Sequence, residues 1–291
     1  MHDQQSVVTF KMISSSTFWY LGLLLLAYLV TTHSAPVQVD WALNTGTDLE
    51  NQRSDYGNDD GNRQWISIVD MVLDTDDGST YLLGVMPPGK VTVCGTEIDT
   101  VSTVSEGVLD DEPKTYKVPF VCVVSQSGEY LAFQPIGSAQ NTTELTVIKL
   151  VKNSSTGKTE SVLLLGSQTV SKTVGTTTYS YMALLSKDLS FIKWVNGTAD
   201  SVIIDAVVMQ EQHVIIALEK HDNQHVLVVY NSSTLSSIID SPTRLVDSYT
   251  GKAYLRRLGD TCICVALPDS DSILTFFELQ SQSDLQVIAS S

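Results

Sequence analysis

One arrangement of strands and turns returns four times along the chain, and it limits the folds that the chain can adopt. The stretch "FVCVVSQSGEYLAF" (120–133) reads as two apolar strands joined by a polar turn. The same design returns in "YMALLSKDLSFIKW" (181–194), "VLVVYNSSTLSSII" (226–239) and "ILTFFELQSQSDLQVI" (273–288). Since no long stretch has helical periodicity, we predict an all-β protein built from a repeated hairpin.

Two further strands precede each hairpin. The nearer ones are "YLLGV" (81–85), "VLLLG" (162–166), "VIIAL" (214–218) and "CICVAL" (262–267). The more distant ones are "WISIVDMVLD" (65–74), "ELTVIKLV" (144–151), "SVIIDAVVMQ" (201–210) and "RLVDSYTG" (244–251). Each unit thus has about four strands over about 45 to 60 residues, the size of a propeller blade. The predicted fold of residues 65–291 is therefore β-propeller-like, with about four blades of four antiparallel strands.

The segment ahead of the first unit predicts how the repeat ends. "VQVDWALNTGTD" (37–48) resembles "FIKWVNGTAD" (191–200), the outer strand of the second unit and the turn after it. A lone outer strand here predicts that the N-terminus completes the last blade, because ring closure removes exposed edge strands. Residues 35–64 are thus predicted to be an outer closing strand and an acidic loop. An open stack of sheets, a sandwich pair and a fragment of a larger ring are the alternatives.

The first unit resembles a known repeat. At "DMVLDTDDGSTYLLG" (70–84) the chain is similar to the bacterial-type β-propeller repeat, in which an Asp-rich turn joins two short apolar strands. The matching residues are Asp70, Asp74, Gly78, Tyr81 and Gly84. The resemblance continues through "GKVTVCGTEID" (89–99) to the first hairpin, is partial in the second unit and is faint thereafter. It implies a scaffold that is commonly extracellular, and it supplies no catalytic residues.

The composition narrows the range of partners. The chain of 291 residues has a formal net charge of −16 at pH 7, and 43% of its residues are apolar. This apolar content is enough for a large core and argues against disorder. The negative charge repels phosphate backbones, so we expect no nucleic-acid partner. Cations or basic partners would be attracted, although acidity also serves solubility alone.

The N-terminal segment predicts export from the cell. Its apolar run "FWYLGLLLLAYLV" (18–30) is short for a membrane span, which needs about 20 residues, and suits a signal-peptide core. Cleavage after Ser34 would leave small residues, Thr32 and Ser34, at the key positions, so residues 1–34 are predicted to be the signal peptide. We therefore predict a secreted, extracellular protein with no membrane span in the mature chain. An N-terminal membrane anchor is the alternative.

Four glycosylation sequons fit this location. They begin at Asn141, Asn153, Asn196 and Asn231. All four fall in segments that we predict to be turns, where an attached glycan would project into water. The mature protein is thus predicted to be a glycoprotein.

The cysteines allow disulfides outside the cell. Their number, four, is even, and Cys94–Cys122 is the predicted pair. Cys262 and Cys264 point to the same face of one strand, so a bond between them would strain an extended backbone. Buried free thiols are the alternative.

An acidic residue recurs at one point of three units. It ends "IVD" at Asp70, "IID" at Asp205 and "LVD" at Asp247. A strand acid of this kind can accept backbone N–H bonds and hold adjacent blades in register, which is the structural interpretation. The functional alternative is a ring of carboxylates around a central channel, able to bind a cation or a sugar.

The turn "DTDDGST" (74–80) is a candidate for calcium. Asp74, Asp76 and Asp77 supply oxygen ligands in a turn bent by glycine, as Ca²⁺ needs. The spacing does not follow the EF-hand, and Asp-Gly turns are common in hairpins without a metal. Calcium is therefore kept only as an alternative, and no other cofactor is predicted.

The motifs favour a protein without catalysis. The sequence has no GxSxG, HExxH, P-loop or dinucleotide motif. We predict a binding or structural scaffold for an extracellular protein or carbohydrate. The polar insertions 49–64 and 101–119 are the expected partner surfaces, because loops on rigid scaffolds often carry recognition. A carbohydrate-active hydrolase with channel-facing carboxylates is the alternative, since the separation of acid pairs is invisible in sequence.

Overall fold

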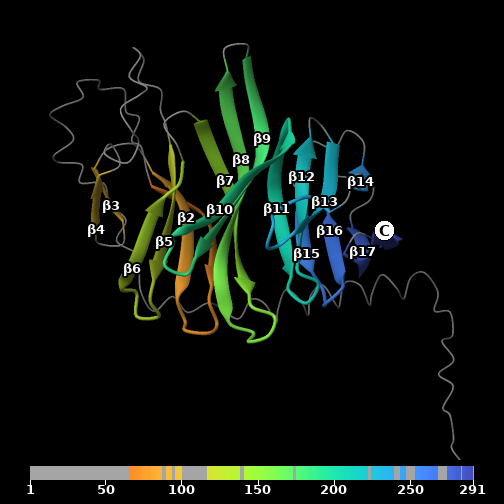
Figure 1. Cartoon of the computed structure of the whole chain (residues 1–291), viewed down its shortest axis with the longest axis horizontal. Helices are drawn as coiled ribbons and strands as arrows, with labels where there is room; N and C mark the ends of the chain where they lie inside the picture. Colours follow the sequence, from red (N-terminus) through yellow and green to blue (C-terminus); the bar gives the residue numbers. More distant parts are fainter. Residues whose placement is uncertain are drawn as a thin grey trace, which may run out of the picture. The chain divides into compact units, whose positions relative to one another are not determined.

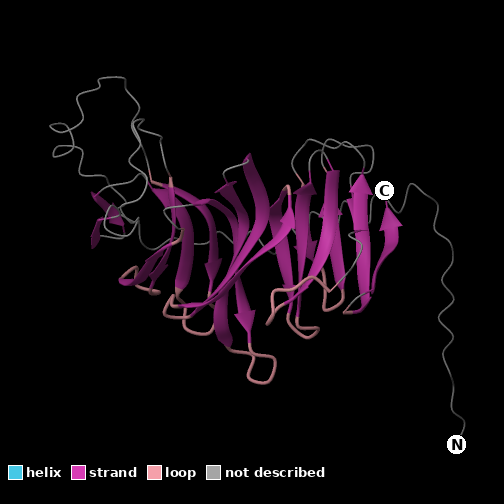
Figure 2. Ribbon diagram, turned by 45° about the horizontal axis from the view of Figure 1, so that its top comes forward, coloured by secondary structure: helices cyan, strands magenta, loops and turns pink. Residues whose placement is uncertain are grey.

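The computed structural model describes residues 66–86, 90–93, 96–99, 117–137, 141–172, 175–221, 224–238, 243–246, 253–267, 274–282 and 284–290. Every regular element in these ranges is a β-strand (Figure 2). With no helix in the described ranges, they hold none that is long and apolar enough to cross a membrane. The predicted signal peptide (1–34), the predicted closing strand with its acidic loop (35–64) and most of the insertion 101–119 lie outside the described residues.

Sixteen of the strands form four antiparallel sheets of four strands, in chain order (Figure 1). The first sheet contains β1 (Ser67–Leu73), β2 (Thr80–Met86), β5 (Val118–Val124) and β6 (Tyr130–Pro135). The second contains β7 (Asn141–Lys152), β8 (Thr159–Lys172), β9 (Gly175–Ser186) and β10 (Phe191–Ala199). The third contains β11 (Ser201–Met209), β12 (Val214–His221), β13 (Gln224–Asn231) and β14 (Thr243–Val246). The fourth contains β15 (Tyr254–Arg257), β16 (Cys262–Ala266), β17 (Leu274–Ser281) and β18 (Asp284–Ser290).

A separate hairpin of β3 (Lys90–Val93) and β4 (Thr96–Asp99) lies between β2 and β5 in the chain. It corresponds to "GKVTVCGTEID". The prediction of an all-β fold built from units of four antiparallel strands is confirmed by the four sheets.

One boundary of the predicted repeat is wrong. The segment 244–251 is predicted above to open the fourth unit, but its first residues belong to β14, which pairs with His225–Leu227 of β13 and ends the third sheet. The fourth sheet opens with β15 instead. The "LVD" pattern that ends at Asp247 therefore begins in an outer strand, whereas "IVD" and "IID" lie in first strands. The three patterns look alike because two apolar residues and an acid suit any half-exposed strand. Asp247 itself lies outside the described residues.

Apolar cores fill the spaces between consecutive sheets. The three cores include Leu83 and Leu164, Leu163 and Ile203, and Leu218 and Leu255, respectively. Strand β5 is buried along its whole length, so side chains on both of its faces are covered. The sequence of such a central strand is therefore a continuous run of apolar residues and does not alternate between apolar and polar ones.

The first strands of three sheets share a β-bulge. The register shifts between Ile68 and Asp70 in β1, between Leu145 and Val147 in β7, and between Ile203 and Asp205 in β11. The residues opposite these bulges, in the second strand of each sheet, are Gly84, Gly166 and Glu219. The first strands are also consecutive neighbours: β1 contacts β7, β7 contacts β11, and β11 contacts β15.

Two of the residues opposite the bulges have no room for a side chain. An added Cβ at Gly166 would lie 2.0 Å from the carbonyl oxygen of Glu144. At Gly84 it would lie 2.4 Å from the ring of Phe120. Glycine is therefore required by close approach at these two positions, whereas the third sheet places a glutamate there.

Candidate functional site

The recurrent acids at the bulges lie at contacts between sheets. The carboxylate of Asp70 accepts the backbone N–H of Ile148 in β7 at 3.0 Å, and also that of the residue after itself. The carboxylate of Asp205 accepts the backbone N–H of Leu255 in β15 at 2.8 Å, and again that of the next residue. Each acid thus fastens the first strand of its sheet to the first strand of the following sheet.

A basic side chain accompanies each of these acids. The Nζ of Lys149 lies 3.8 Å from the carboxylate of Asp70, and a guanidinium nitrogen of Arg256 lies 2.9 Å from that of Asp205. Between the second and third sheets a hydroxyl makes the equivalent contact, since Thr146 at the bulge of β7 donates to the carbonyl oxygen of Ile203 at 2.6 Å. The predicted position of the acids therefore holds polar contacts between first strands, and no shared pocket joins Asp70 to Asp205 among those described.

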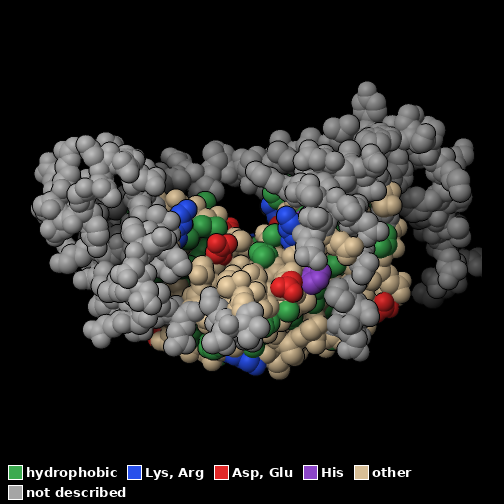
Figure 3. All heavy atoms as spheres, turned by 90° about the horizontal axis from the view of Figure 1, so that it is seen from above, with side chains coloured by type: hydrophobic (Ala, Val, Ile, Leu, Met, Phe, Trp, Pro, Cys, Tyr) green, Lys and Arg blue, Asp and Glu red, His purple; other side chains and the backbone are tan. Residues whose placement is uncertain are grey.

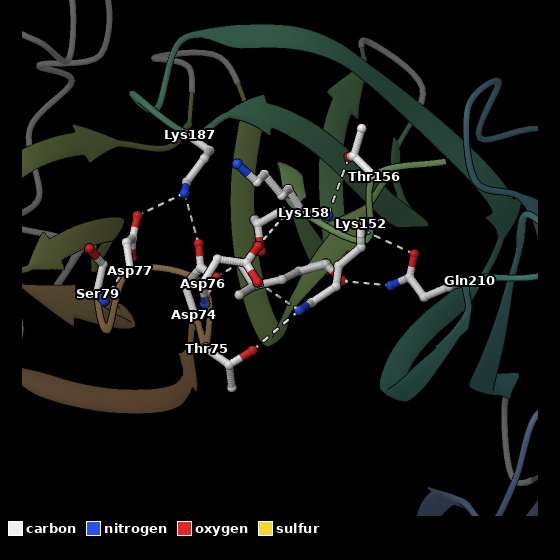
Figure 4. A network of polar contacts seen from close by, with 12 residues as sticks. Asp74, Thr75, Asp76, Asp77, Ser79, Lys152, Thr156, Lys158, Lys187 and Gln210 are labelled. Atoms are coloured by element: carbon white, nitrogen blue, oxygen red, sulfur yellow. Dashed lines mark hydrogen bonds and ion pairs between the residues drawn. The ribbon is translucent and has the colours of Figure 1, made fainter. Parts of the chain in front are cut away.

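The acidic turn between β1 and β2 meets a lysine of the second sheet (Figure 4). The Nζ of Lys187 lies 2.9 Å from the carboxylate of Asp74 and 2.8 Å from that of Asp77. Asp74 is fully buried and also accepts the hydroxyl of Thr159 at 2.9 Å. An ammonium group therefore stands between two of the three carboxylates considered above as calcium ligands.

The third carboxylate of this turn faces a second lysine. Asp76 accepts the backbone N–H of Thr159 at 2.6 Å and lies 3.2 Å from the Nζ of Lys152. The bond from Thr159 lowers the pKa of Asp76, and the bond from Lys187 lowers the pKa of Asp77 to about 2. In the described ranges no group of three or more His, Cys, Asp or Glu side chains is placed to hold a metal ion. The turn and the two lysines form a network of ion pairs between the first and second sheets.

A buried carboxylate that was not predicted from the sequence lies opposite the bulge of the third sheet. Glu219 is 0% exposed and accepts the hydroxyl of Ser201 at 2.6 Å and the phenol of Tyr230. Burial, together with the adjacent carboxylate, raises the pKa of Tyr230, so the phenol stays protonated and donates. An alignment of the units could have indicated this residue, because Glu219 occupies the position that holds Gly84 and Gly166 in the first two units.

Tyr230 also borders a pocket of about 440 Å³. The pocket lies between residues 195–198 of β10 and residues 234–237, which follow β13. The described polar residues of its lining carry hydroxyl and amide groups, and none of the described lining residues is charged.

A second pocket, of about 310 Å³, lies where the first strands of the four sheets end, and we call it the first-strand groove. Its charged lining residues are Lys149, Lys152 and Arg257. Its apolar wall includes Leu73 and Val207. No acidic side chain is among the described residues that line this groove, whereas the functional alternative considered above is a ring of carboxylates. The groove could not be predicted from the sequence, because its three cations come from β7 and β15, which are distant in the chain.

The predicted glycosylation sites lie in two kinds of place. Asn153 and Asn231 open equivalent turns, in which each side-chain oxygen accepts the backbone N–H groups two and three residues on. Asn141 and Asn196 lie in strands β7 and β10, so the prediction of a turn is wrong for these two.

The cysteines give no disulfide in the described part of the chain. Cys122, Cys262 and Cys264 are described, and no pair of their sulfur atoms is at bonding distance. Burial raises the pKa of Cys264 to about 11, so its thiol is held in the unreactive protonated form. Cys94, the predicted partner of Cys122, lies outside the described residues.

Comparison with known proteins adds no assignment to this geometry. The chain matches no model of a known protein family, and no curated protein matches its sequence. The chemistry available to the described residues is therefore judged from the residues themselves: carboxylates engaged between sheets, a neutral pocket beside Tyr230, and a groove lined by cations.

Proposed function

We propose that the chain is a non-catalytic scaffold of β-propeller-like blades that binds an extracellular protein or carbohydrate. Three features support the interpretation of the sheets as blades: their order in the chain, the cores between consecutive sheets, and the adjacent first strands. The resemblance of the first unit to the bacterial-type β-propeller repeat favours the same interpretation.

The engagement of Asp70 and Asp205 carries the proposal. A glycosidase needs two carboxyl groups about 5 to 10 Å apart that face one substrate site. These two acids instead accept backbone N–H groups at different contacts between sheets, and neither described pocket is lined by an acid. The hydrolase alternative therefore gains no support from the described residues.

We also propose that the scaffold is secreted and glycosylated. The turn that begins at Asn153 supports this, because residues 154–158 are exposed and leave room for a glycan. Secretory expression followed by enzymatic removal of N-glycans tests it. The expected result is a loss of mass that becomes smaller in the Asn153→Gln variant, and an unchanged mass of the wild-type protein would contradict it.

Substitution of Asp205 separates the structural role from a catalytic one. Asp205→Ala leaves the buried N–H of Leu255 without its acceptor, so we expect the free energy of unfolding to fall by about 2 kcal/mol. The control is Asp260→Ala, because the side chain of Asp260 is 77% exposed, and its expected effect is below about 0.5 kcal/mol.

The same proteins are incubated with a panel of glycosides, and released sugar is measured. The expected result is no release by any of them. Hydrolysis by the wild-type protein that Asp70→Ala or Asp205→Ala abolishes without loss of stability would overturn the proposed function.

A further inference from the structure

We infer that the first-strand groove binds a small organic anion through Lys149, Lys152 and Arg257. The inference deepens the proposed function and rests on it, because it names the class of ligand that the scaffold takes up at this place. The groove receives residues from β1, β7, β11 and β15, the first strands of all four sheets.

The charged side chains that line the groove are opposite in sign to the net charge of the protein. The chain has 33 acidic residues against 17 Lys and Arg, yet the charged groups that line the groove are all basic. Figure 3 shows the end of the molecule opposite to the groove, where a few acidic and basic side chains are scattered over the described surface. A local group of cations attracts an anion that the rest of the surface repels.

Each of the three cations has a carboxylate partner, which neutralises it only in part. Arg257 donates to the carboxylate of Asp260 at 2.7 Å and to the carbonyl oxygen of Gly259 at 2.8 Å, but the side chain of Asp260 is 77% exposed, so solvent screens this pair. Asp70 lies 3.8 Å from Lys149 and directs the same oxygen to the backbone N–H of Ile148. Asp76 shares its charge between Lys152 and a backbone N–H. Asp70 and Asp76 thus also accept backbone N–H groups, and the two ammonium groups and the guanidinium of Arg257 retain further N–H donors for a ligand.

The cations are held against the wall of the groove. The side chains of Lys149, Lys152 and Arg257 are 30%, 32% and 35% exposed. Partial removal from water strengthens the attraction between such a cation and a bound anion. It also reduces the side-chain entropy that binding has to remove.

Hydrogen bonds between the sheets fix the floor of the groove. The side chain of Gln210 accepts the backbone N–H of Lys152 at 2.9 Å and donates to the carbonyl oxygen of Leu150 at 3.1 Å. The Nζ of Lys152 also donates to the hydroxyl of Thr75 at 3.2 Å. The ends of β1, β7 and β11 are thereby joined before any ligand arrives, which favours binding.

The size and the wall of the groove specify the ligand further. A volume of about 310 Å³ is at the lower end of ligand pockets, so the ligand is small. Leu73, Leu150 and Val207 give the groove an apolar side. A carboxylate or phosphate group on a compact apolar body fits this combination of charge and wall.

Calorimetric titration with matched probes tests the inference. The anionic probes are phenyl phosphate and benzoate, and the neutral match is benzamide. Each is titrated into the full-length protein. We expect the anions to bind at low ionic strength and at least tenfold more weakly in 0.5 M NaCl, because salt screens the cations. Benzamide is expected to bind at least tenfold more weakly than benzoate.

The variant pair Lys149→Gln and Arg257→Gln, made together, is expected to weaken binding of phenyl phosphate at least tenfold. Its matched control is Lys158→Gln with Lys193→Gln, which changes the net charge equally at exposed positions outside the groove and is expected to change affinity less than twofold. Equal weakening by both pairs, or equal binding of benzoate and benzamide, would overturn the inference. Urea unfolding of each variant checks that the fold is retained.

The two levels of the proposal fail differently. Absence of binding to an intact scaffold overturns the anion site and leaves the proposed function standing. Release of phosphate from phenyl phosphate that the groove variants abolish overturns the non-catalytic function while the anion site stands.

Discussion

The first and third sheets use the same bulge and the same acid, but they differ in the residue opposite. Asp70 and Asp205 both accept an N–H from the first strand of the next sheet. Opposite the bulge, however, the first sheet has Gly84 under the ring of Phe120, and the third sheet has the buried carboxylate of Glu219. One sheet allows close packing by omitting a side chain, and the other fills the place with a charged group.

The two sheets also differ in how their first turn meets the next sheet. The turn of the first sheet uses Asp74, Asp76 and Asp77 against lysines, whereas the turn of the third sheet accepts a neutral hydrogen bond from Gln282 to the carbonyl oxygen of Gln212 at 2.8 Å. The carboxylates of the first sheet therefore lie in the turn at its end, whereas the carboxylate of Glu219 lies inside the third sheet. A buried carboxylate is costly unless its hydrogen bonds are complete, so the third sheet depends more on a few hydroxyls.

Removal of the buried carboxylate has the largest expected effect. Glu219→Ala leaves a cavity and takes the acceptor from the hydroxyls of Ser201 and Tyr230, so we expect the free energy of unfolding to fall by about 3 to 4 kcal/mol. Glu219→Gln keeps the volume and is expected to cost about half as much. Urea unfolding at pH 7 measures both, with Glu211→Ala in the exposed turn before β12 as a control expected to stay within about 0.5 kcal/mol. Equal stability of Glu219→Gln and wild type would show that the third sheet does not need the charge.

The opposite change in the first sheet has the next largest effect. Gly84→Ala places a methyl group against the ring of Phe120 and the carbonyl oxygen of Ser67, and we expect a loss of about 2 kcal/mol in thermal or urea unfolding. Gly259→Ala is the control, because an added Cβ at Gly259 meets no atom within 4 Å. Tolerance of Gly84→Ala would mean that the first sheet can also accept a side chain opposite its bulge.

Local sequence patterns were sufficient to predict most of the strands but not the contacts between the sheets. Apolar runs bounded by polar turns located fourteen of the strands in the four sheets at or near their positions, because a strand buried on both faces is continuous in its composition. The boundary between the third and fourth units was wrong, since β14 is a short outer strand with the same local pattern as a first strand. Partners distant in the chain were invisible: Lys187 meets Asp77 across 110 residues, and Glu219 resembles the polar end of an ordinary strand.

Removal of Lys187 is expected to have a moderate effect on the first sheet. Lys187→Met leaves the fully buried Asp74 without its cation, and we expect a loss of about 1.5 kcal/mol, reduced by the partial exposure of the lysine. Lys193→Met on the exposed strand β10 is the control. Asp74→Asn introduced into Lys187→Met should restore part of the stability in a double-mutant cycle, because it removes the buried charge. No restoration would assign the loss to packing of the lysine stem.

The smallest expected effect is the pH dependence of the charged turn, which the third sheet lacks. The pKa of Asp77 is lowered from 3.8 to about 2 by its bond from Lys187, so the folded state binds the proton less readily than the unfolded chain. The stabilisation is therefore complete above about pH 4 and is lost as the pH falls towards 2. Because the side chain of Asp77 is 45% exposed, solvent screening keeps the contribution below about 1 kcal/mol. The measurement is the difference in urea midpoint between wild type and Asp77→Asn at pH 6, 4, 3 and 2.5. That difference should shrink as the pH falls, and a difference that stayed constant or grew would remove the ionised Asp77 from the contact between the first and second sheets.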